Sequence, residues 1–204
     1  KSYILITGAQ GEVGSELIKS ISRDNSIQII TLDLHPLGTN ISKYVTKHII
    51  GSVLDEKLIE QINLNYKINS IYHLAAILST SAESSPTLAH NVNVNGTVNI
   101  LELARKQSEK NNINIKVFFP SSIAVYGVEN RLKEQKLSEK QELNPITIYG
   151  CNKIYAEKLG VYYSHQYSKK AGTSIDFRVI RFPGLISSTT IPQGGTSDFI
   201  PEMW

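Results

Sequence analysis

The amino-acid sequence predicts an α/β fold of the Rossmann type, a doubly wound parallel sheet with helices on both faces. Strand-like and helix-like segments alternate along the 204 residues, and a glycine-rich turn joins the first strand to the first helix. Several strand-like runs are also apolar nearly throughout, as in strands that helices cover on both faces. The chain is long enough for one such domain, with the start of a small C-terminal substrate segment after it.

Six strand-like runs alternate with four segments of helical apolar spacing. The strands are expected at residues 3–7, 27–33, 46–50, 70–74, 115–119 and 175–182. The helices are expected at residues 12–23, 55–65, 85–110 and 147–171. Two polar or Pro- and Gly-containing stretches, 128–145 and 183–197, are expected to be surface loops.

The first turn carries glycines at every third position, Gly8, Gly11 and Gly14. The strand-like run before them ends at Thr7, and an amphipathic run starts at Val13. Glycines permit a tight turn and close backbone approach, and a helix N-terminus offers free N–H groups to a pyrophosphate. Glycines can also serve only to pack a helix on a strand, but the strand–turn–helix context favours a dinucleotide site.

Ligands of such sheets bind beyond the carboxyl ends of the strands. Asp33 ends the second strand, where a carboxylate can accept hydrogen bonds from both adenosine ribose hydroxyls and would repel a 2′-phosphate. We therefore expect NAD rather than NADP, although an ordinary loop Asp is the alternative. Ser52 and Val53 follow the third strand and are expected beneath the adenine.

The fourth strand is followed by small residues, Leu74-Ala75-Ala76, which would let a dinucleotide lie across the sheet. The next segment, Ile77-Leu78-Ser79-Thr80, offers hydroxyl groups near the nicotinamide end. Taken alone, this segment is merely typical of a loop.

Tyr149 and Lys153 lie four residues apart in a predicted helix, so they share a face with Cβ atoms roughly 5–6 Å apart. An ammonium beside a phenol stabilises the phenolate, and a Tyr otherwise titrates near about 10. A Tyr tuned in this way can exchange a proton with a sugar or alcohol oxygen. Without further support, however, this spacing is a common accident on helix surfaces.

Ser121 and Ser122 follow the fifth strand, where a Ser pair could simply cap a helix or form a turn. Together with the Tyr and Lys, Ser122 completes a candidate catalytic set. Ser122 would hydrogen-bond the substrate oxygen, Tyr149 would exchange its proton, and Lys153 would tune Tyr149 and hold the nicotinamide ribose.

Composition excludes several other classes of function. The hydrophobic content of 41% suits a core, and the net charge of +3 comes from scattered lysines, so no nucleic-acid partner is expected. Cys151 is the single cysteine and the five His lack metal-ligand spacing, so no metal site is expected. No run is apolar enough to span a membrane. We expect a cytoplasmic protein, or a mitochondrial one if a transit peptide preceded Lys1.

Taken together, these residues resemble the extended short-chain dehydrogenase/reductase family over nearly the whole chain. The matching segments are Gly8-x-x-Gly11-x-x-Gly14, Asp33, His73-Leu74-Ala75-Ala76, Asn93-Val94-Asn95-Gly96-Thr97, Ser121-Ser122 through Tyr126-Gly127, and Tyr149-x-x-x-Lys153. The resemblance implies that Asn93 supports the active-site water and backbone geometry, and that helices near 88–110 and 147–171 form a homodimer's four-helix bundle. Ser52 departs from the Asp of many members, which puts the adenine contact in doubt.

The resemblance implies two sets of ligand-binding residues and a division at residue 182. Residues 1–182 would form the NAD-binding domain, and 183–204 the start of a truncated substrate-binding segment. The expected NAD-binding residues are Gly8, Gln10, Gly11, Glu12, Val13, Gly14, Asp33, Ser52, Val53, Leu74, Ala75, Ala76, Asn93, Tyr149, Lys153 and Pro183.

Within the family, the chain looks most similar to the short-chain type of L-threonine 3-dehydrogenase. The segment Pro192-Gln193-Gly194-Gly195-Thr196-Ser197-Asp198-Phe199 resembles a glycine signature of that branch, with departures at Gln193 and Ser197. The resemblance implies NAD-dependent oxidation of L-threonine to 2-amino-3-ketobutyrate, and a pocket lined by Ser79, Thr80, Ser122, Tyr149 and Thr196. Many enzymes of the branch carry Thr at the position of Ser122, so a hydroxyl is kept.

Two alternatives stay open. A nucleotide-sugar epimerase or dehydratase would use the same Ser, Tyr and Lys, but the Gly194-Gly195-Thr196 segment favours threonine. A cofactor-binding protein without turnover is the other alternative, because the family normally continues into a domain that covers the substrate. Without that domain the site would be exposed to solvent and the substrate would be loosely held, and both effects lower the rate.

Overall fold

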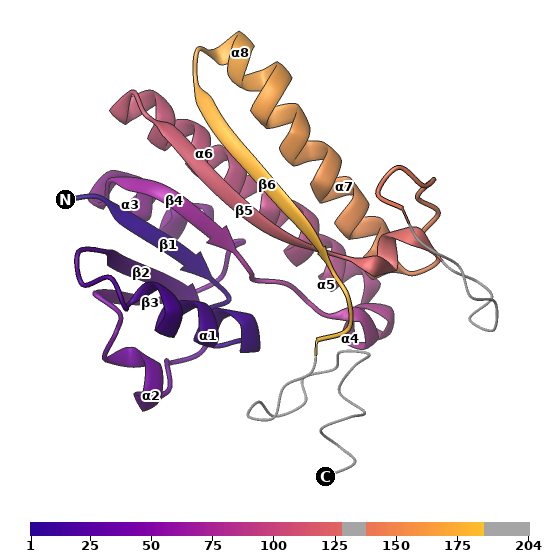
Figure 1. The fold of residues 1–204 in the computed structure, drawn as a ribbon, viewed down its shortest axis with the longest axis horizontal. Helices are drawn as coiled ribbons and strands as arrows, with labels where there is room; N and C mark the ends of the chain where they lie inside the picture. Colours follow the sequence, from indigo (N-terminus) through magenta and orange to yellow (C-terminus); the bar gives the residue numbers. More distant parts are fainter. Residues whose placement is uncertain (128–137, 186–204) are drawn as a thin grey trace.

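The six expected strands form one parallel sheet in the computed structural model, which describes residues 1–127 and 138–185. The strand order is β3-β2-β1-β4-β5-β6, the order of a doubly wound dinucleotide-binding sheet. Every neighbouring pair of strands is parallel. The predicted Rossmann-type fold is therefore confirmed (Figure 1).

The strands lie within a few residues of their expected positions. They are β1 (Tyr3–Thr7), β2 (Gln28–Asp33), β3 (Lys47–Ile50), β4 (Ile68–His73), β5 (Asn114–Ser122) and β6 (Ser174–Phe182). β5 is longer than expected, because its pairing with β6 continues through Ser121 and Ser122. The two serines therefore belong to the end of the strand rather than to the loop after it.

The helices account for the remaining regular structure of the described residues. They are α1 (Glu12–Ile21), α2 (Thr39–Ser42), α3 (Glu56–Asn65), α4 (Ser79–Ser84), α5 (Pro86–His90), η1 (Asn91–Asn95), α6 (Gly96–Asn111), η2 (Ile123–Tyr126), α7 (Ile148–Tyr162), η3 (Tyr163–Tyr167) and α8 (Ser168–Ala171). The two long helices expected at 85–110 and 147–171 each contain a π-helical turn, η1 and η3. The segment that looked loop-like around Ser79 and Thr80 is the start of a helix.

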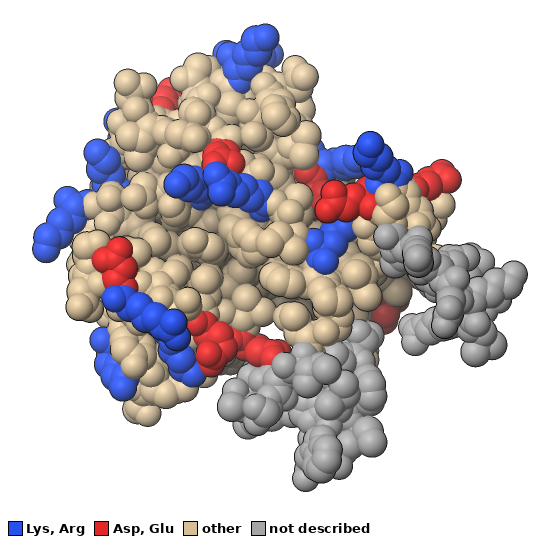
Figure 2. All heavy atoms as spheres, in the orientation of Figure 1, with Lys and Arg blue, Asp and Glu red and all other residues tan. Residues whose placement is uncertain are grey.

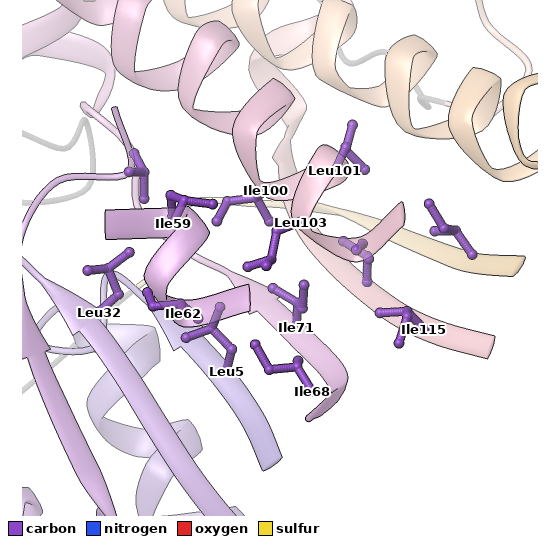
Figure 3. Packing of buried hydrophobic residues seen from close by; sticks show 14 of the residues in the cluster. Leu5, Leu32, Ile59, Ile62, Ile68, Ile71, Ile100, Leu101, Leu103 and Ile115 are labelled. Atoms are coloured by element: carbon purple, nitrogen blue, oxygen red, sulfur yellow. The ribbon is translucent and has the colours of Figure 1, made fainter. Parts of the chain in front are cut away.

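Two hydrophobic clusters pack the helices onto opposite faces of the sheet. The larger contains Ile59 and Ile62 of α3 and Ile100 and Leu103 of α6, packed on strand residues such as Ile71 (Figure 3). The smaller places α1 and α2 on the other face of β1 and β2. β2 is buried at four consecutive residues, as its continuous apolar run predicts. This two-sided burial fixes the carboxyl ends of the central strands, where the site lies.

Charged side chains are dispersed over the face of the molecule shown in Figure 2. Lys and Arg lie in several separate groups, with Asp and Glu beside some of them. Some charged side chains are paired locally, for example Arg105 with Glu102 and Glu109 on α6. Within the described part of the chain, no helix is both long enough and apolar enough to cross a membrane.

Candidate active site

A cavity of about 620 Å³ opens at the carboxyl ends of β1, β2 and β4, where the sequence places the dinucleotide. Twelve of the expected NAD-binding residues line it: Gly8, Gln10, Gly11, Glu12, Val13, Gly14, Asp33, Ser52, Val53, Leu74, Ala75 and Ala76. Asn93, Tyr149, Lys153 and Pro183 are not among its walls. Pro183 is exposed and lies just beyond β6.

The glycine turn is tight at both of its ends. Gly8 has φ +67°, and a Cβ there would lie 2.6 Å from the backbone nitrogen of Ala75. A Cβ at Gly14 would lie 2.5 Å from the carbonyl oxygen of Gly8. The first glycine therefore lets the turn approach the end of β4, and the third lets α1 approach the turn.

The N-terminus of α1 faces this cavity with free backbone donors. Gly11 is the N-cap and has no side chain, and the first backbone bond of the helix is from Ser15 N to Gly11 O at 2.9 Å. The N–H groups of Glu12, Val13 and Gly14 therefore precede the intrahelical bonding and stay available to an anion. This donor set fits the pyrophosphate of a dinucleotide.

Asp33 is held in one orientation at the adenosine end of the cavity. Its Oδ2 accepts from the backbone N–H of Gln10 at 2.9 Å, and its Oδ1 accepts from that of His35 at 3.0 Å. The Gln10 side chain then ties the turn to the next loop, because its Oε1 accepts from Gly38 N at 2.9 Å. The carboxylate keeps further lone pairs for two ribose hydroxyls.

Ser52, at the adenine end of the cavity, uses its side chain to stabilise the turn in which it lies. Its Oγ accepts from the backbone N–H of Leu54 at 3.1 Å, so its hydroxyl oxygen is already engaged. Val53 beside it is buried and packs into the larger core cluster. These two residues line the cavity as expected, and position 52 carries a hydroxyl rather than a carboxylate.

The reacting end is built around the N-terminus of α7. Thr147 caps this helix, since its Oγ1 accepts from Gly150 N at 3.0 Å. A Cβ at Gly150 would lie only 2.6 Å from the carbonyl oxygen of Ala124. Gly150 therefore lets α7 pack closely on η2, which brings Tyr149 toward the end of β5.

Lys153 is buried beneath Tyr149 and points at the end of β5. Its Nζ donates to the carbonyl oxygen of Pro120 at 2.6 Å and lies 5.2 Å from the centre of the Tyr149 ring. Only 3% of the residue is exposed. Burial lowers the pKa of Lys153 to about 7, against an opposing effect of the nearby Glu157 carboxylate.

The pKa of Tyr149 differs from the sequence expectation. Burial raises it to about 12, whereas the neighbouring ammonium was expected to lower it. The reason is geometric, because Lys153 gives its hydrogen bond to Pro120 and lies over the face of the ring. The chain alone therefore holds Tyr149 as a protonated phenol.

Ser122 and its neighbour Ser121 have different partners. Ser122 Oγ accepts from Ala124 N at 3.2 Å and caps η2, the role that a Ser pair most often has at a strand end. Ser121 Oγ donates to Glu157 Oε1 at 2.5 Å. Glu157 also receives two hydrogen bonds from Arg181 of β6 at 3.0 and 2.8 Å. These contacts tie α7 to both strands beneath the reacting end.

The Glu157 carboxylate stays ionised within this network. Burial acts to raise its pKa, but hydrogen bonds from Arg181 and Ser121 outweigh that effect and leave the pKa lowered. Glu157 and Arg181 received no role in the sequence analysis and could not be paired from it, because they lie 24 residues apart on different elements.

Asn93 connects the wall of the dinucleotide cavity to α7, the helix that carries Tyr149 and Lys153. Its side-chain amide brackets one residue of the cavity wall, with Oδ1 accepting from Ile77 N at 2.8 Å and Nδ2 donating to Ile77 O at 3.0 Å. The same Nδ2 lies 3.4 Å from Asn152 Oδ1 on α7. Asn93 is on the π-turn η1, a local distortion that is frequent at functional sites.

Four of the five expected substrate residues lie on three described elements, α4, β5 and α7, and the fifth lies outside the described residues. Ser79 and Thr80 open α4, between Leu78 and Ser81, which line the cavity. Glu83 of the same helix accepts from the backbone N–H of Ile148 at 2.8 Å, which ties α4 to the start of α7. Thr196 lies outside the described residues, as does most of the expected segment 183–204.

The geometry defines a class of protein. A parallel sheet in the order 3-2-1-4-5-6, a glycine turn before a helix N-terminus and a carboxylate at the end of β2 together form a dinucleotide-binding site. In residues 1–127 and 138–185, no group of three or more metal-ligating side chains could hold a metal ion.

The chain belongs to the NAD dependent epimerase/dehydratase family, whose model matches residues 4–203. This membership confirms the family resemblance and NAD as the cofactor. The mitochondrial L-threonine 3-dehydrogenase of Bos taurus is 31% identical over 98% of this chain and 50% of its own length. An uncharacterised epimerase/dehydratase of Staphylococcus epidermidis is 33% identical over 98% of this chain and 59% of its own.

A solved structure of a threonine dehydrogenase also resembles this chain in fold and sequence. A monomeric L-threonine 3-dehydrogenase from a metagenome superposes with a TM-score of 0.82 at 40% identity, covering 98% of this chain and 59% of its own. The chain thus spans between 50% and 59% of the length of these relatives.

Proposed function

We propose that the protein oxidises L-threonine to 2-amino-3-ketobutyrate with NAD. The observation that carries the proposal is that the Tyr149–Lys153 pair and the dinucleotide cavity lie at the same edge of the sheet. Tyr149 and the buried Lys153 stand at the end of β5, beside a cavity whose donors fit a dinucleotide. Similarity to threonine dehydrogenases at 31–40% identity supports threonine as the substrate.

Three side chains share the proposed chemistry. Tyr149, in its phenolate form, takes the proton of the substrate's β-hydroxyl, and Ser122 donates a hydrogen bond to the oxygen that becomes a carbonyl. Lys153 fixes the ring of Tyr149 from below and supplies positive charge while it is protonated. NAD, when bound, supplies the acceptor for the hydride that leaves the β-carbon and a positive charge on its nicotinamide ring.

The elevated pKa of Tyr149 has a consequence for the reaction. A phenol with a pKa of about 12 is almost entirely protonated at neutral pH, so the reactive phenolate is scarce. The rate is therefore expected to rise with pH on the alkaline side of neutrality. The charge of a bound nicotinamide would act in the same direction, by favouring the phenolate.

The direct experiment is to follow NADH absorbance with purified protein, NAD and L-threonine at mildly alkaline pH. Allo-threonine and serine serve as controls for the β-carbon configuration and its methyl group. NADH formation specific to L-threonine is the expected result. Saturable NAD binding without turnover of threonine would contradict the proposal and favour a binding protein.

A nucleotide-sugar epimerase or dehydratase is the second candidate, because several relatives are described only as epimerase/dehydratases. The same Ser122, Tyr149 and Lys153 would act on a sugar hydroxyl. UDP-sugars in the same assay, with product analysis by chromatography, distinguish this candidate from a threonine dehydrogenase.

A homodimer through α6 and α7 is part of the proposal. Tyr155, Val161 and Tyr162 of α7 are large apolar side chains with 51%, 46% and 48% of their surface exposed, which supports a further contact there. One solved relative is described as monomeric, so the assembly needs its own measurement. Light scattering after size exclusion would show a mass twice that of the chain if the helices pair.

A further inference from the structure

His73 lies at the centre of a buried chain of hydrogen bonds beneath the cavity. Its Nδ1 is 2.8 Å from Thr7 Oγ1, and its Nε2 is 3.1 Å from Thr97 Oγ1. The chain continues at both ends, from Ala75 N to Thr7 Oγ1 at 3.3 Å and from Thr97 Oγ1 to Asn93 O at 2.7 Å. The His and both Thr residues are at most 2% exposed, so water does not compete for these groups.

The partners at the two ends of the chain determine the direction of every bond in it. Asn93 O can only accept, so Thr97 gives its hydroxyl hydrogen to that carbonyl and must accept from His73 Nε2–H. His73 Nδ1 then lacks a hydrogen and accepts from the Thr7 hydroxyl. Thr7 Oγ1 in turn accepts from Ala75 N–H. One neutral tautomer of His73, with hydrogen on Nε2, satisfies all four bonds.

We propose that His73 is a positioning residue, whose Nε2–H tautomer fixes the spacing of the NAD-binding walls. Thr7 immediately precedes the Gly8 turn, and Ala75 is a wall residue on the opposite side. Asn93, at the far end of the chain, holds the wall residue Ile77 through its side chain. The hydrogen-bonded chain therefore connects the glycine turn, the segment after β4 and the π-turn η1.

The glycine turn and the segment after β4 approach so closely that small movements between them would alter the cavity. Gly8 and Ala75 are so near that a Cβ at Gly8 would lie 2.6 Å from Ala75 N. A small shift of β1 against β4 would therefore change both the turn and the wall. The imidazole also stays neutral, because burial and the charge of Lys153 lower the pKa of His73 to about 3.

The first test reads the tautomer directly. Long-range 1H–15N spectra of the protein with 15N-labelled His distinguish hydrogen on Nε2 from hydrogen on Nδ1. The expected result for His73 is a protonated Nε2 and a bare Nδ1 at neutral pH. A protonated Nδ1 would overturn the assignment.

The second test uses Thr97, which lies in α6 and outside the cavity walls. Thr97→Val keeps the shape but removes the acceptor of His73 Nε2–H, whereas Thr97→Ser keeps the hydroxyl. In Thr97→Val the tautomer should shift toward hydrogen on Nδ1, and the NAD dissociation constant should rise roughly three- to tenfold, the worth of one hydrogen bond. Thr97→Ser should keep the tautomer and the affinity of the wild-type protein.

Thr7→Val and Thr7→Ser provide a second pair in case the first Val variant does not fold. Thr7→Val removes the donor to His73 Nδ1 and should raise the NAD dissociation constant to a similar degree. A Val variant that is folded and binds NAD as the wild-type protein does would show that the chain only packs the core. Because NAD binding is the readout, these outcomes stand whether or not threonine is the substrate.

Discussion

The two halves of the site are built from different parts of the chain. The dinucleotide half depends on the backbone, namely the glycine turn, the first N–H groups of α1 and an Asp33 held by backbone donors. The reacting half depends on side chains, such as Tyr149 and Lys153, on helices that pack through specific contacts. A substitution should therefore damage the first half through shape and the second half through chemistry.

The largest expected effect separates the halves most cleanly. Tyr149→Phe removes one oxygen from the reacting half, and general acid–base groups are worth roughly 100- to 10,000-fold in rate. Turnover of the substrate should fall by that factor, while NAD affinity stays within about twofold. Steady-state NADH formation and a NAD titration measure the two quantities. Loss of NAD binding would mean that the phenol has a structural role.

Gly8→Ala should have the opposite pattern and break the dinucleotide half. The new Cβ would meet Ala75 N at 2.6 Å, and overpacking of this kind costs about 1–3 kcal/mol beyond the strain of the positive φ. NAD affinity should fall roughly tenfold or more.

Gly172→Ala is the matched control for that variant. Gly172 has the same φ of +67°, but a Cβ there would meet nothing within 4 Å. It should lower the free energy of unfolding by about 1–2 kcal/mol through backbone strain alone and leave NAD affinity unchanged. Equal losses of NAD affinity in the two variants would show that strain, rather than the close approach of the walls, matters.

The buried Lys153 should make the stability of the reacting half depend on pH. Its pKa is about 7 in the folded chain against an ordinary 10.5, so between these values the unfolded chain binds the extra proton. The free energy of unfolding should therefore rise with pH from about 7 to 10.5, by roughly 2–3 kcal/mol between pH 7 and 9. This contribution is complete above 10.5 and is lost as the pH falls toward 7.

Urea unfolding at several pH values tests this expectation. Lys153→Met should flatten the rise, while Lys158→Met, on an exposed position of the same helix, should leave it unchanged. A wild-type slope that persists in Lys153→Met would assign the effect to another group.

The smallest expected effect concerns the contact between α4 and α7. Glu83→Ala removes the carboxylate that accepts from Ile148 N and should cost about 1 kcal/mol of stability, with a severalfold lower kcat. Asp55→Ala removes a similar cap, to Leu58 N at 3.0 Å on α3, and should cost about the same stability. Only the Glu83 variant should change kcat, since α3 is not part of the reacting half.

Sequence patterns were most informative where function depends on local backbone geometry. The glycine turn, Asp33 and the Ala75-Ala76 wall follow directly from their places at strand ends, and all of them line the cavity. The strands themselves were predictable because apolar runs buried on both faces leave few alternatives.

Contacts between distant elements were not predictable in this way. His73 entered the sequence analysis only as the first residue of the His73-Leu74-Ala75-Ala76 match, but it joins β1 to α6 through residues 66 and 24 positions away. Ser121, Glu157 and Arg181 likewise meet only because β5, α7 and β6 are adjacent in space.

The pKa values of Tyr149 and Lys153 likewise depend on contacts that the sequence could not predict. The spacing of Tyr149 and Lys153 correctly placed the two side chains together on one helix. It could not show that Lys153 would bond to Pro120, nor that burial would raise rather than lower the pKa of Tyr149.

The sequence by itself determined the order of the elements, the dinucleotide site and the identity of the candidate catalytic side chains. These features depend on residues close together in the chain, whose conformation local sterics and hydrophobic spacing control. Only the tertiary structure decided the protonation states, the hydrogen-bonded chain through His73 and the attachment of α4 to α7. Those properties depend on burial and on partners from distant segments, which chain folding brings together.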